Sequence, residues 1–420
     1  MSKLKKHIIA LAQSARNASY ELSSVPTKLK NKTLQDMAQA LKRNKAVILK
    51  ANKRDVVAVE KKKISQALID RLRLTDVRIT SMSDSLQVVA RLKDPVGQMI
   101  RSWRRPNGLT ISKVRVPIGV IAIIYEARPN VTADCIGLCL KSSNVVILKG
   151  GSEALHSNIA IYKVLKEAIK KNRLPASSIN LIETSDRRAV DELLRLSDQI
   201  DLVIPRGGEG LIRRVVRKST IPVLKHYKGV CHTYVDRKVN LDMAQRICFN
   251  AKVQRPSVCN AMETLLVHKD IAAQFLPRIV RQLEESGVEI RGCLVTKRIC
   301  GKHIKTASEK DWGAEYLDLL LAVKVVKSAE EAIKHIHRYG SSHSDAIVTE
   351  DKSMANLFLQ KVDSACVFVN TSTRFSDGYE FGFGSEIGIS TDKLHARGPM
   401  ALEELTTYKY TIVGRGQIRK

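Results

Sequence analysis

The sequence has 420 residues, of which 71 are lysine or arginine and 42 are aspartate or glutamate, so the formal net charge is +29. Apolar residues make up 44% and charged residues 27%, a balance that is typical of globular proteins and excludes a disordered chain. The length allows two or three domains. The apolar run 116–125 is shorter than the roughly 20 residues of a membrane span, and no secretory signal is expected.

The cysteines do not form a framework or a metal-binding pattern. Eight of them are spread along the chain, which favours reduced thiols in a cytoplasmic protein. Cys135 and Cys139 would share one helix face, but no further ligands lie nearby in the sequence. They are therefore interpreted as core residues, and no metal is expected.

Residues 1–100 predict a helical region. The segment 33–36 has the spacing of a capping box before the amphipathic run 37–49, and a heavily charged helix is expected over 56–72. Turn-forming residues at 94–97 end this region.

Strands and helices alternate from about residue 109. Residues 109–116 alternate apolar and polar side chains, which predicts a half-exposed strand, and the apolar run 116–126 predicts a strand covered on both faces. Further strands are expected at 144–148, 179–182, 201–204 and 221–224, and helices at 154–171, 188–196 and 210–218. This order predicts a parallel sheet between helices, with ligands beyond the carboxyl ends of the strands.

A second α/β pattern follows residue 235. A helix is expected at 271–286, and another is capped by Ser328 and ends at Gly340. Buried strands are expected at 346–348 and 366–369. The alternating segment 402–413 predicts an edge strand that pairs with another subunit.

Glycine-rich turns follow two of the predicted strands. One contains Lys149, Gly151 and Ser152, and the other contains Gly207 and Gly208. Exposed N–H groups and the helix dipole at such turns favour an anion such as a phosphate. One such turn alone can be simple turn chemistry, but two at one sheet edge favour nucleotide binding.

Two loops carry candidate reactive groups. Cys259 follows Arg255 in a polar loop, and a guanidinium stabilises the thiolate that a nucleophile requires. A buried structural thiol is an equal alternative from this context alone. The amide of Asn130 can donate to an oxyanion, and Arg128 can bind a carboxylate or phosphate. For these two residues a turn and a surface arginine remain the alternatives.

Six motifs occur in order along nearly the whole chain: VPIGVIAIIYEARPNV, LKGGSEA, DLVIPRGGEGLI, AKVQRPSVCNAMETLLVH, DWGAEYLDLLLAVKVV and RFSDGYEFGFGSEIGISTDKLHARGPMALEELTTYKY. Together they resemble the gamma-glutamyl phosphate reductases (glutamate-5-semialdehyde dehydrogenases), a family within the aldehyde dehydrogenase superfamily. The resemblance implies an oxidoreductase that reduces L-glutamate 5-phosphate to L-glutamate 5-semialdehyde and phosphate with NADPH, the second step of proline biosynthesis.

The resemblance also implies roles for individual residues. Cys259 is the implied nucleophile, whose thiolate displaces phosphate and forms a thioester that is then reduced. Asn130 and the backbone N–H of Cys259 are the implied oxyanion donors. Lys149 is the implied contact of the adenosine ribose, and Glu315 that of the nicotinamide ribose.

Two positions depart from the pattern of hydrolytic superfamily members. Lys225 aligns with their general-base glutamate, and a charged lysine attracts a leaving phosphate rather than activating water. Lys225 and its neighbour His226 are therefore candidate phosphate contacts. Ser152 replaces a glutamate that is common in NAD-preferring members, which removes a repulsion against the 2′-phosphate of NADPH.

The substrate is a small anion, and three arginines in motif loops are candidates to bind it: Arg128, Arg255 and Arg374. The loop 374–386 is expected to form a wall of its pocket. Two alternatives stay open, a general aldehyde dehydrogenase and a basic nucleic-acid-binding protein. The second is disfavoured because the chain has only 7 Phe, 10 Tyr and 2 Trp and no basic-aromatic platform for stacking bases.

We therefore expect an α/β, aldehyde-dehydrogenase-like architecture with two Rossmann-type parallel-sheet domains and a small β oligomerisation extension. The expected ranges are 1–100 and 117–226 for the cofactor-binding domain, 227–398 for the catalytic domain, and 101–116 with 399–420 for the extension. A homodimer or homotetramer is expected, with functional coupling to glutamate 5-kinase as a further hypothesis. No membrane and no specific nucleic acid are expected as partners.

Overall fold

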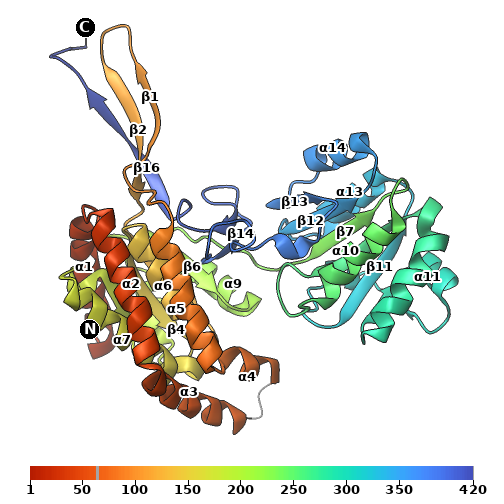
Figure 1. Cartoon of the computed structure of the whole chain (residues 1–420), viewed down its shortest axis with the longest axis horizontal. Helices are drawn as coiled ribbons and strands as arrows, with labels where there is room; N and C mark the ends of the chain where they lie inside the picture. Colours follow the sequence, from red (N-terminus) through yellow and green to blue (C-terminus); the bar gives the residue numbers. More distant parts are fainter. Residues whose placement is uncertain (63–65, 420) are drawn as a thin grey trace. The chain divides into compact units, whose positions relative to one another are not determined.

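The computed structural model describes residues 1–62 and 66–419. It divides into two compact units, each with its own parallel sheet (Figure 1). Unit 1 consists of Met1–Lys225, Gly382–Gly388 and Met400–Lys420, and unit 2 of His226–Phe381 and Ile389–Pro399.

Unit 1 opens with a helical region, as predicted. Within the described residues its helices are α1 (Lys3–Leu22), α2 (Thr27–Arg43), α3 (Lys45–Glu60), α4 (Gln66–Leu72) and α5 (Asp76–Arg91). The expected capping box is wrong, because Thr33 lies inside α2 and its hydroxyl donates to the Leu29 carbonyl at 2.8 Å. The single helix expected over 56–72 is also wrong, since α3 ends at Glu60; residues 63–65 of that range lie outside the described residues.

The parallel sheet of unit 1 has the strand order β5-β4-β3-β6. Its elements are β3 (Val120–Tyr125), α6 (Asn130–Lys141), β4 (Val145–Gly150), α7 (Leu155–Lys171), β5 (Ile179–Leu181), α8 (Arg188–Leu193), β6 (Leu202–Arg206) and α9 (Glu209–Lys218). Every residue of β3 and β4 is buried, which confirms the interpretation of the continuous apolar runs.

The strand expected at 221–224 is wrong. Only Val223 forms a bridge, with Val203, and the backbone bonds on either side run from Val203 N–H to the Pro222 carbonyl and from Leu224 N–H to the Val203 carbonyl. Pro222 has no N–H, so it cannot donate to a ladder that would extend this bridge into a strand.

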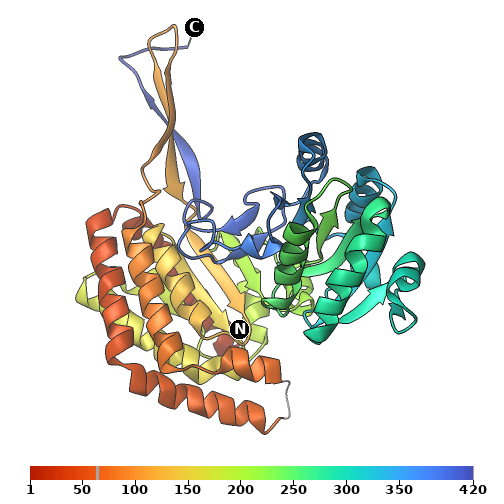
Figure 2. The same cartoon turned by 45° about the vertical axis from the view of Figure 1, so that its right-hand side comes forward.

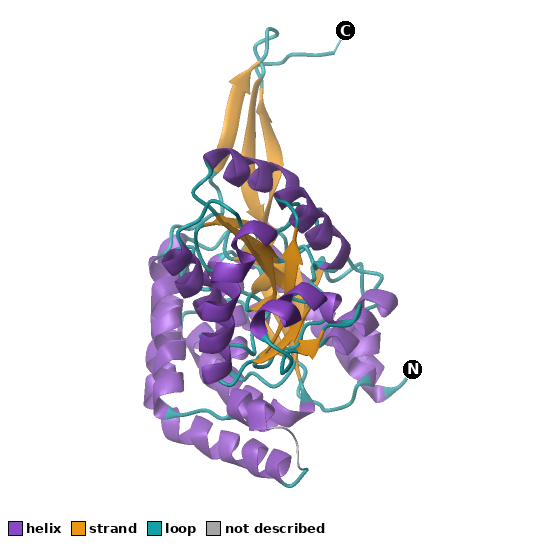
Figure 3. Cartoon of the chain, turned by 90° about the vertical axis from the view of Figure 1, so that its right-hand side faces the viewer, coloured by secondary structure: helices purple, strands orange, loops and turns teal. Residues whose placement is uncertain are grey.

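An antiparallel three-stranded sheet projects from the rest of unit 1 (Figures 1 and 2). It consists of β1 (Met99–Arg104), β2 (Thr110–Pro117) and β16 (Thr406–Val413), and Figure 3 shows these three strands side by side. The pairing of β2 with β16 confirms the expected combination of 109–116 with the 402–413 segment. Gly119, at φ +129°, separates β2 from β3 inside the run that the sequence had suggested to be one strand.

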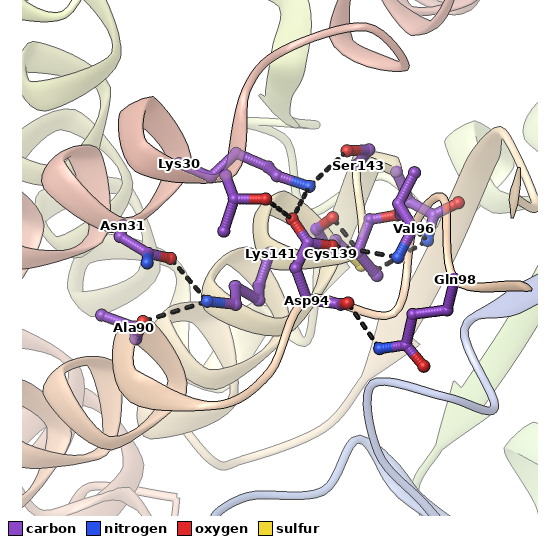
Figure 4. A network of polar contacts seen from close by, with 12 residues as sticks. Lys30, Asn31, Ala90, Asp94, Val96, Gln98, Cys139, Lys141 and Ser143 are labelled. Atoms are coloured by element: carbon purple, nitrogen blue, oxygen red, sulfur yellow. Dashed lines mark hydrogen bonds and ion pairs between the residues drawn. The ribbon is translucent and has the colours of Figure 1, made fainter. Parts of the chain in front are cut away.

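A buried polar network anchors the base of this extension (Figure 4). Lys30 Nζ lies 2.5 Å from Asp94 Oδ2 and donates to Ser143 Oγ at 2.9 Å. Lys141 Nζ donates to the Ala90 carbonyl at 3.0 Å, and Gln98, just before β1, donates to the Asp94 carbonyl at 2.6 Å. Burial lowers the pKa of both lysines. The turn that leads into β1 is thereby held against α2, α5 and α6.

Unit 2 contains a seven-stranded sheet in its described residues, parallel throughout, with the order β10-β9-β11-β8-β7-β12-β13. Its strands are β7 (Cys231–Val235), β8 (Met262–His268), β9 (Glu289–Gly292), β10 (Lys305–Thr306), β11 (Leu320–Val326), β12 (Ser344–Val348) and β13 (Cys366–Val369). Its helices are α10 (Leu241–Val253), α11 (Lys269–Glu285), α12 (Leu294–Cys300), α13 (Ala329–Tyr339) and α14 (Lys352–Lys361).

The predicted elements of unit 2 are confirmed. The hydroxyl of Ser328 accepts the Glu331 N–H at the start of α13, and Gly340 follows the last helical residue. Apolar residues of α11, among them Phe275 and Leu283, are buried in the core cluster together with β8 and β11 residues. A short pair of strands, β14 (Gly388–Ser390) and β15 (Gly398–Met400), completes the fold.

Candidate active site

The first group of predicted site residues lies at the carboxyl edge of the unit 1 sheet. Because β4, β3 and β6 are neighbours, the segments that follow them meet at one edge. These segments carry Arg128, Asn130, Lys149, Gly151, Ser152, Gly207 and Gly208. The structure therefore brings together, within one unit, all the residues predicted from the first three motifs.

Lys149 is a buried cation at this edge. Lys149 is the penultimate residue of β4 and is 5% exposed, and its Nζ donates to the Gly150 carbonyl at 2.7 Å. Burial lowers the pKa of the ammonium, while the carboxylates of Glu153 and Asp186 oppose this shift. An ammonium has three donors, so Lys149 can also hold a hydroxyl or phosphate oxygen of a ligand.

The amide of Asn130 is oriented by a carboxylate one helical turn away. Asn130 is the first residue of α6, and its Nδ2 donates to Asp134 Oδ2 at 3.1 Å. Asp134 also accepts the Ser85 hydroxyl of α5 at 3.1 Å. Burial raises the pKa of Asp134 to about 6, although Asn130, Ser85 and the positive charge of Arg206 oppose the shift. The second N–H of the Asn130 amide remains available for an oxyanion, the role predicted for this residue.

The N-termini of the two helices behind the glycine turns interact with carboxylates of the chain itself. Asp55 of α3 accepts the backbone N–H groups of His156 and Ser157 in the first turn of α7, at 3.2 and 2.7 Å. Glu126 accepts the Gly208 N–H before α9 at 2.9 Å. The prediction of exposed N–H groups is therefore wrong for α7, because Asp55 accepts them and its charge opposes the helix dipole. At α9 the exposed Glu126 would compete with a bound anion for Gly208.

The residues at this edge fit a dinucleotide cofactor. The Asn158 amide nitrogen is buried and has no hydrogen-bond partner among the described residues. It lies 2.1 Å from the position that a Cβ at Gly150 would take, so the glycine makes room for the Asn158 amide. A Cβ at Gly210, in the first turn of α9, would meet nothing within 4 Å. The Lys149 ammonium and the open space at Gly210 in the first turn of α9 suit ribose hydroxyls and phosphate oxygens.

The second group of site residues lies at the opposite, amino edge of the unit 2 sheet. Cys259 is half-buried in the turn between α10 and β8, so it precedes its strand. This position differs from that of the predicted site residues in unit 1, which follow their strands. Beside it, the Cys231 thiol at the start of β7 donates to the Cys259 carbonyl at 3.2 Å.

Gly229 packs directly against the backbone of Cys259. A Cβ at Gly229 would lie 2.0 Å from the Cys259 carbonyl oxygen and 2.6 Å from its Cα, distances that no real side chain has. The Gly229 N–H donates to Glu315 Oε1 at 2.8 Å. One glycine thus connects the predicted nucleophile to the predicted ribose-binding glutamate.

Arg374 reaches the same turn through Asn260. Its guanidinium donates to the side-chain oxygen Oδ1 of Asn260, and it donates to Gln254 Oε1 at 2.9 Å. The Asn260 amide donates to the Ser376 carbonyl at 2.8 Å, which ties the 372–376 loop to the residue after Cys259. Burial lowers the pKa of Arg374, and so does Arg255, while Cys259 opposes the shift. Arg255 and Cys259 therefore both act on the electrostatics of the Arg374 guanidinium.

Comparisons with known proteins identify the family of this chain. The model of the aldehyde dehydrogenase family matches residues 2–291. The chain is 57% identical to the gamma-glutamyl phosphate reductase of Thermodesulfovibrio yellowstonii, over 99% of the chain and 100% of that protein. The crystal structure of gamma-glutamyl phosphate reductase from Thermotoga maritima superposes with a TM-score of 0.96 at 48% identity, covering 98% of this chain and 100% of that one.

This chain belongs to the gamma-glutamyl phosphate reductases of the aldehyde dehydrogenase family. An acetylating aldehyde dehydrogenase from Geobacillus thermoglucosidasius has the same fold at 17% identity, with a TM-score of 0.73 and coverage of 100% of this chain and 98% of that one. The expected aldehyde-dehydrogenase-like α/β fold is confirmed. The division of labour between the two domains stays a prediction.

The remaining candidate residues of this gamma-glutamyl phosphate reductase are placed as follows. Lys225 is half-buried at the end of a unit 1 segment, and Arg128 is half-buried before α6; both have interaction partners. His226 opens unit 2, and its Nδ1 lies 2.8 Å from the Ile389 carbonyl, so this nitrogen carries the proton of the ring. Arg255 is exposed, as is Ser152.

Sequence reasoning missed Gly229, Asp134 and Asn260. Asn260 follows the predicted nucleophile, so its position in the motif was a signal. Asp134 lies four residues after Asn130, the spacing at which two side chains meet on a helix. Gly229 had no such signal, because its close approach to Cys259 joins residues 30 positions apart in the sequence.

No helix within residues 1–62 and 66–419 is both long enough and apolar enough to cross a membrane.

Proposed function

We propose that this protein reduces L-glutamate 5-phosphate to L-glutamate 5-semialdehyde and phosphate with NADPH, through a thioester on Cys259. The observation that carries the proposal is the 57% identity to a gamma-glutamyl phosphate reductase over 99% of the chain. The close packing of Gly229 on Cys259 and the electrostatic interaction of Cys259 with Arg374 support it as the nucleophile.

The proposed reaction begins with the Cys259 thiolate. Its sulfur attacks the acyl carbon of the substrate, a C–S bond forms, and the bond to phosphate breaks with the electron pair leaving on phosphate. The Asn130 amide and the Cys259 N–H hold the oxyanion of the tetrahedral intermediate. A bound nicotinamide cofactor supplies a hydride. After reduction of the thioester, the C–S bond breaks, which releases the aldehyde product and regenerates the Cys259 thiolate.

The basic residues have proposed roles in holding the anions. Arg374 is the best-supported candidate to stabilise the thiolate and to bind the substrate, because its guanidinium interacts electrostatically with Cys259. Arg255, four residues before Cys259, is a second candidate for the substrate. Lys225 and His226 are proposed phosphate contacts, and Arg128 is a further candidate for the substrate. His226 Nδ1 donates to the Ile389 carbonyl, so Nε2 would donate to the phosphate in the imidazolium form of the ring.

The cofactor is proposed to lie against the carboxyl edge of the unit 1 sheet. Lys149 would hold the adenosine ribose, Glu315 the nicotinamide ribose, and the turns at Gly151 and Gly207–Gly208 the phosphates. The preference for NADPH over NADH is proposed from Ser152, which is exposed and carries no negative charge against a 2′-phosphate. Comparing steady-state kinetics with the two cofactors tests this preference.

The three-stranded extension is proposed to pair subunits in a homodimer or homotetramer. Its outer residues Met99, Tyr408, Tyr410 and Ile412 are exposed apolar side chains. A cytoplasmic location and functional coupling to glutamate 5-kinase are proposed on the family assignment alone. Sedimentation of the wild-type protein measures the oligomeric state.

The test of the proposed function is the reaction run in reverse with semialdehyde, phosphate and NADP⁺. Wild type should produce NADPH only when phosphate is present, and Cys259→Ala should lose at least about 1,000-fold in kcat. Cys300→Ser, a thiol on α12, is the matched control and should retain full activity. Phosphate-independent oxidation to the free acid would instead favour a general aldehyde dehydrogenase, and undiminished turnover by Cys259→Ala would overturn the mechanism.

The phosphate contact is tested separately. Lys225→Ala should weaken the affinity for phosphate and for the acyl phosphate by about tenfold, because a charge-assisted hydrogen bond is lost. Unchanged affinities for both would show that Lys225 is not a phosphate ligand. The KM for phosphate in the reverse reaction is the measurement.

A further inference from the structure

A fully buried ion pair lies beneath the turn that carries Glu315. Lys252 of α10 and Glu263 of β8 are both 0% exposed, and Lys252 Nζ donates to Glu263 Oε2 at 2.6 Å. Burial raises the pKa of Glu263 and lowers that of Lys252, so burial opposes the charged form of each. Pairs of this kind are often replaced by apolar residues without loss of stability, so stability alone gives a weak reason for this one.

The second oxygen of Glu263 binds the backbone of the Glu315 turn. Oε1 accepts the Leu317 N–H at 3.0 Å. Leu317 has φ +55°, a left-handed conformation that is unfavourable for a leucine and persists only where surrounding contacts impose it. The bond from Glu263 is such a contact, and Lys252, which donates to the other oxygen of the same side chain, fixes the orientation that this bond needs.

Further contacts hold the same turn. The Tyr316 hydroxyl donates to Asp311 Oδ1 at 2.9 Å, and Glu315 Oε1 accepts the Gly229 N–H at 2.8 Å. Gly229 in turn packs on Cys259. Since Glu263 lies four residues after Cys259, these contacts close a ring from the nucleophile through Gly229 and the 315–317 turn back to the start of β8.

We propose that the Lys252–Glu263 pair is a positioning device that sets the 315–317 turn, and through it Glu315, in the conformation that receives the nicotinamide ribose. This inference rests on the proposed role of Glu315 in cofactor binding. Glu263 and Lys252 are positioning residues and act through the turn. The pair should therefore govern the affinity for the cofactor more than the chemical step at Cys259.

Two double variants separate positioning from simple packing. Lys252→Met with Glu263→Gln removes both charges but keeps an oxygen for the Leu317 N–H. Lys252→Met with Glu263→Met removes the charges and the acceptor. The readouts are the dissociation constant of NADPH, from its fluorescence in the absence of substrate, together with kcat, KM for NADPH and the melting temperature.

The Met/Gln variant should bind NADPH within about threefold of wild type, whereas the Met/Met variant should bind it about tenfold more weakly with a smaller change in kcat. Equal NADPH affinity in the two variants would overturn the proposal. If Met/Met does not fold, Glu263→Gln alone decides, because its one oxygen cannot serve both donors. It should weaken NADPH binding about threefold, and unchanged binding would overturn the proposal.

Glu315→Ala distinguishes the failure of this inference from that of the assigned cofactor role. Weaker NADPH binding by Glu315→Ala together with unchanged binding by Met/Met would overturn the positioning role only. Unchanged binding by Glu315→Ala with weaker binding by Met/Met would support the pair's control of the turn and reject Glu315 as the ribose contact. Unchanged binding by both would overturn both.

Discussion

The two parallel sheets of this protein carry their candidate site residues at opposite edges. In unit 1, Asn130, Lys149 and Gly208 follow strands and lie at the carboxyl edge, where helices begin. In unit 2, Cys259 and Glu315 precede β8 and β11 and lie at the amino edge, where helices end. The same α/β architecture therefore offers two different electrostatic surroundings.

The two edges differ because helices begin at one and end at the other. Helix N-termini present free N–H groups and a partial positive charge, which suits phosphates, and the chain neutralises part of it with Asp55 and Glu126. Helix C-termini present carbonyl groups and a partial negative charge, which disfavours a thiolate. Cys259 lies after α10, which ends at Val253, and it interacts electrostatically with the guanidinium of Arg374. At this edge a side-chain cation therefore supplies positive charge of the kind that helix N-termini supply at the carboxyl edge.

The largest expected effect is at the amino edge, for Gly229→Ala. The new Cβ has no room beside the Cys259 carbonyl, so the nucleophile must shift, and kcat should fall about 100-fold. Gly313→Ala is the control, because its Cβ would meet only the Tyr339 carbonyl at 3.7 Å. Steady-state kinetics and melting temperatures of both variants are the measurements. Wild-type kcat in a folded Gly229→Ala protein would refute the close-packing explanation.

A smaller effect is expected at the carboxyl edge, for Asp134→Ala. Without the carboxylate the Asn130 amide can rotate, and kcat should fall about tenfold, less than when an oxyanion donor is removed altogether. Asn130→Ala in parallel shows how large the full effect is. If Asn130→Ala is impaired and Asp134→Ala is not, Asp134 does not orient the amide.

The pKa of Asp134 makes the difference in stability between wild type and Asp134→Asn depend on pH. Its pKa is raised to about 6 in the folded protein, so between about pH 4 and pH 6 the folded state retains a proton that the unfolded state has lost. Stability of the wild type therefore falls as the pH rises through this window. Asp134→Asn lacks this penalty and should melt a few degrees above wild type at pH 8 but not at pH 4. Equal differences at the two pH values would contradict the raised pKa.

The smallest effect is expected for Glu126→Gln, also at the carboxyl edge. The glutamine oxygen can still accept the Gly208 N–H, but the charge that opposes a bound pyrophosphate is gone. NADPH should bind about threefold more tightly at low salt, with less difference at high salt. Titration of NADPH fluorescence at two salt concentrations measures this. Unchanged affinity at low salt would mean that no phosphate approaches the start of α9.

Local pattern predicted much of the fold. The apolar runs of β3, β4 and β13 and the capped helix α13 were recognisable because burial and capping act on neighbouring residues. The capping box at Thr33 was misleading, since Thr33 forms its bond inside a helix that begins earlier, at Thr27. Pro222 left one bridge where a strand was expected.

The structure gives specific partners to several of the lysines and arginines that make the chain so basic. Some of the excess cations have specific partners: Lys30 is paired with Asp94, Lys252 with Glu263, and Arg374 is bound to Asn260. The two ion pairs hold elements of the fold together, and the bond of Arg374 lies at the residue that follows Cys259.

The sequence by itself determined the family, the α/β class and the identity of Cys259, Asn130 and Lys149 as candidates, because these depend on motifs of adjacent residues. Only the tertiary structure decided that the nucleophile precedes its strand, that Gly229 must lack a side chain, and that Glu263 holds the Glu315 turn. Each of these joins residues that are distant in the chain, and a close approach between distant backbones leaves no local pattern to read.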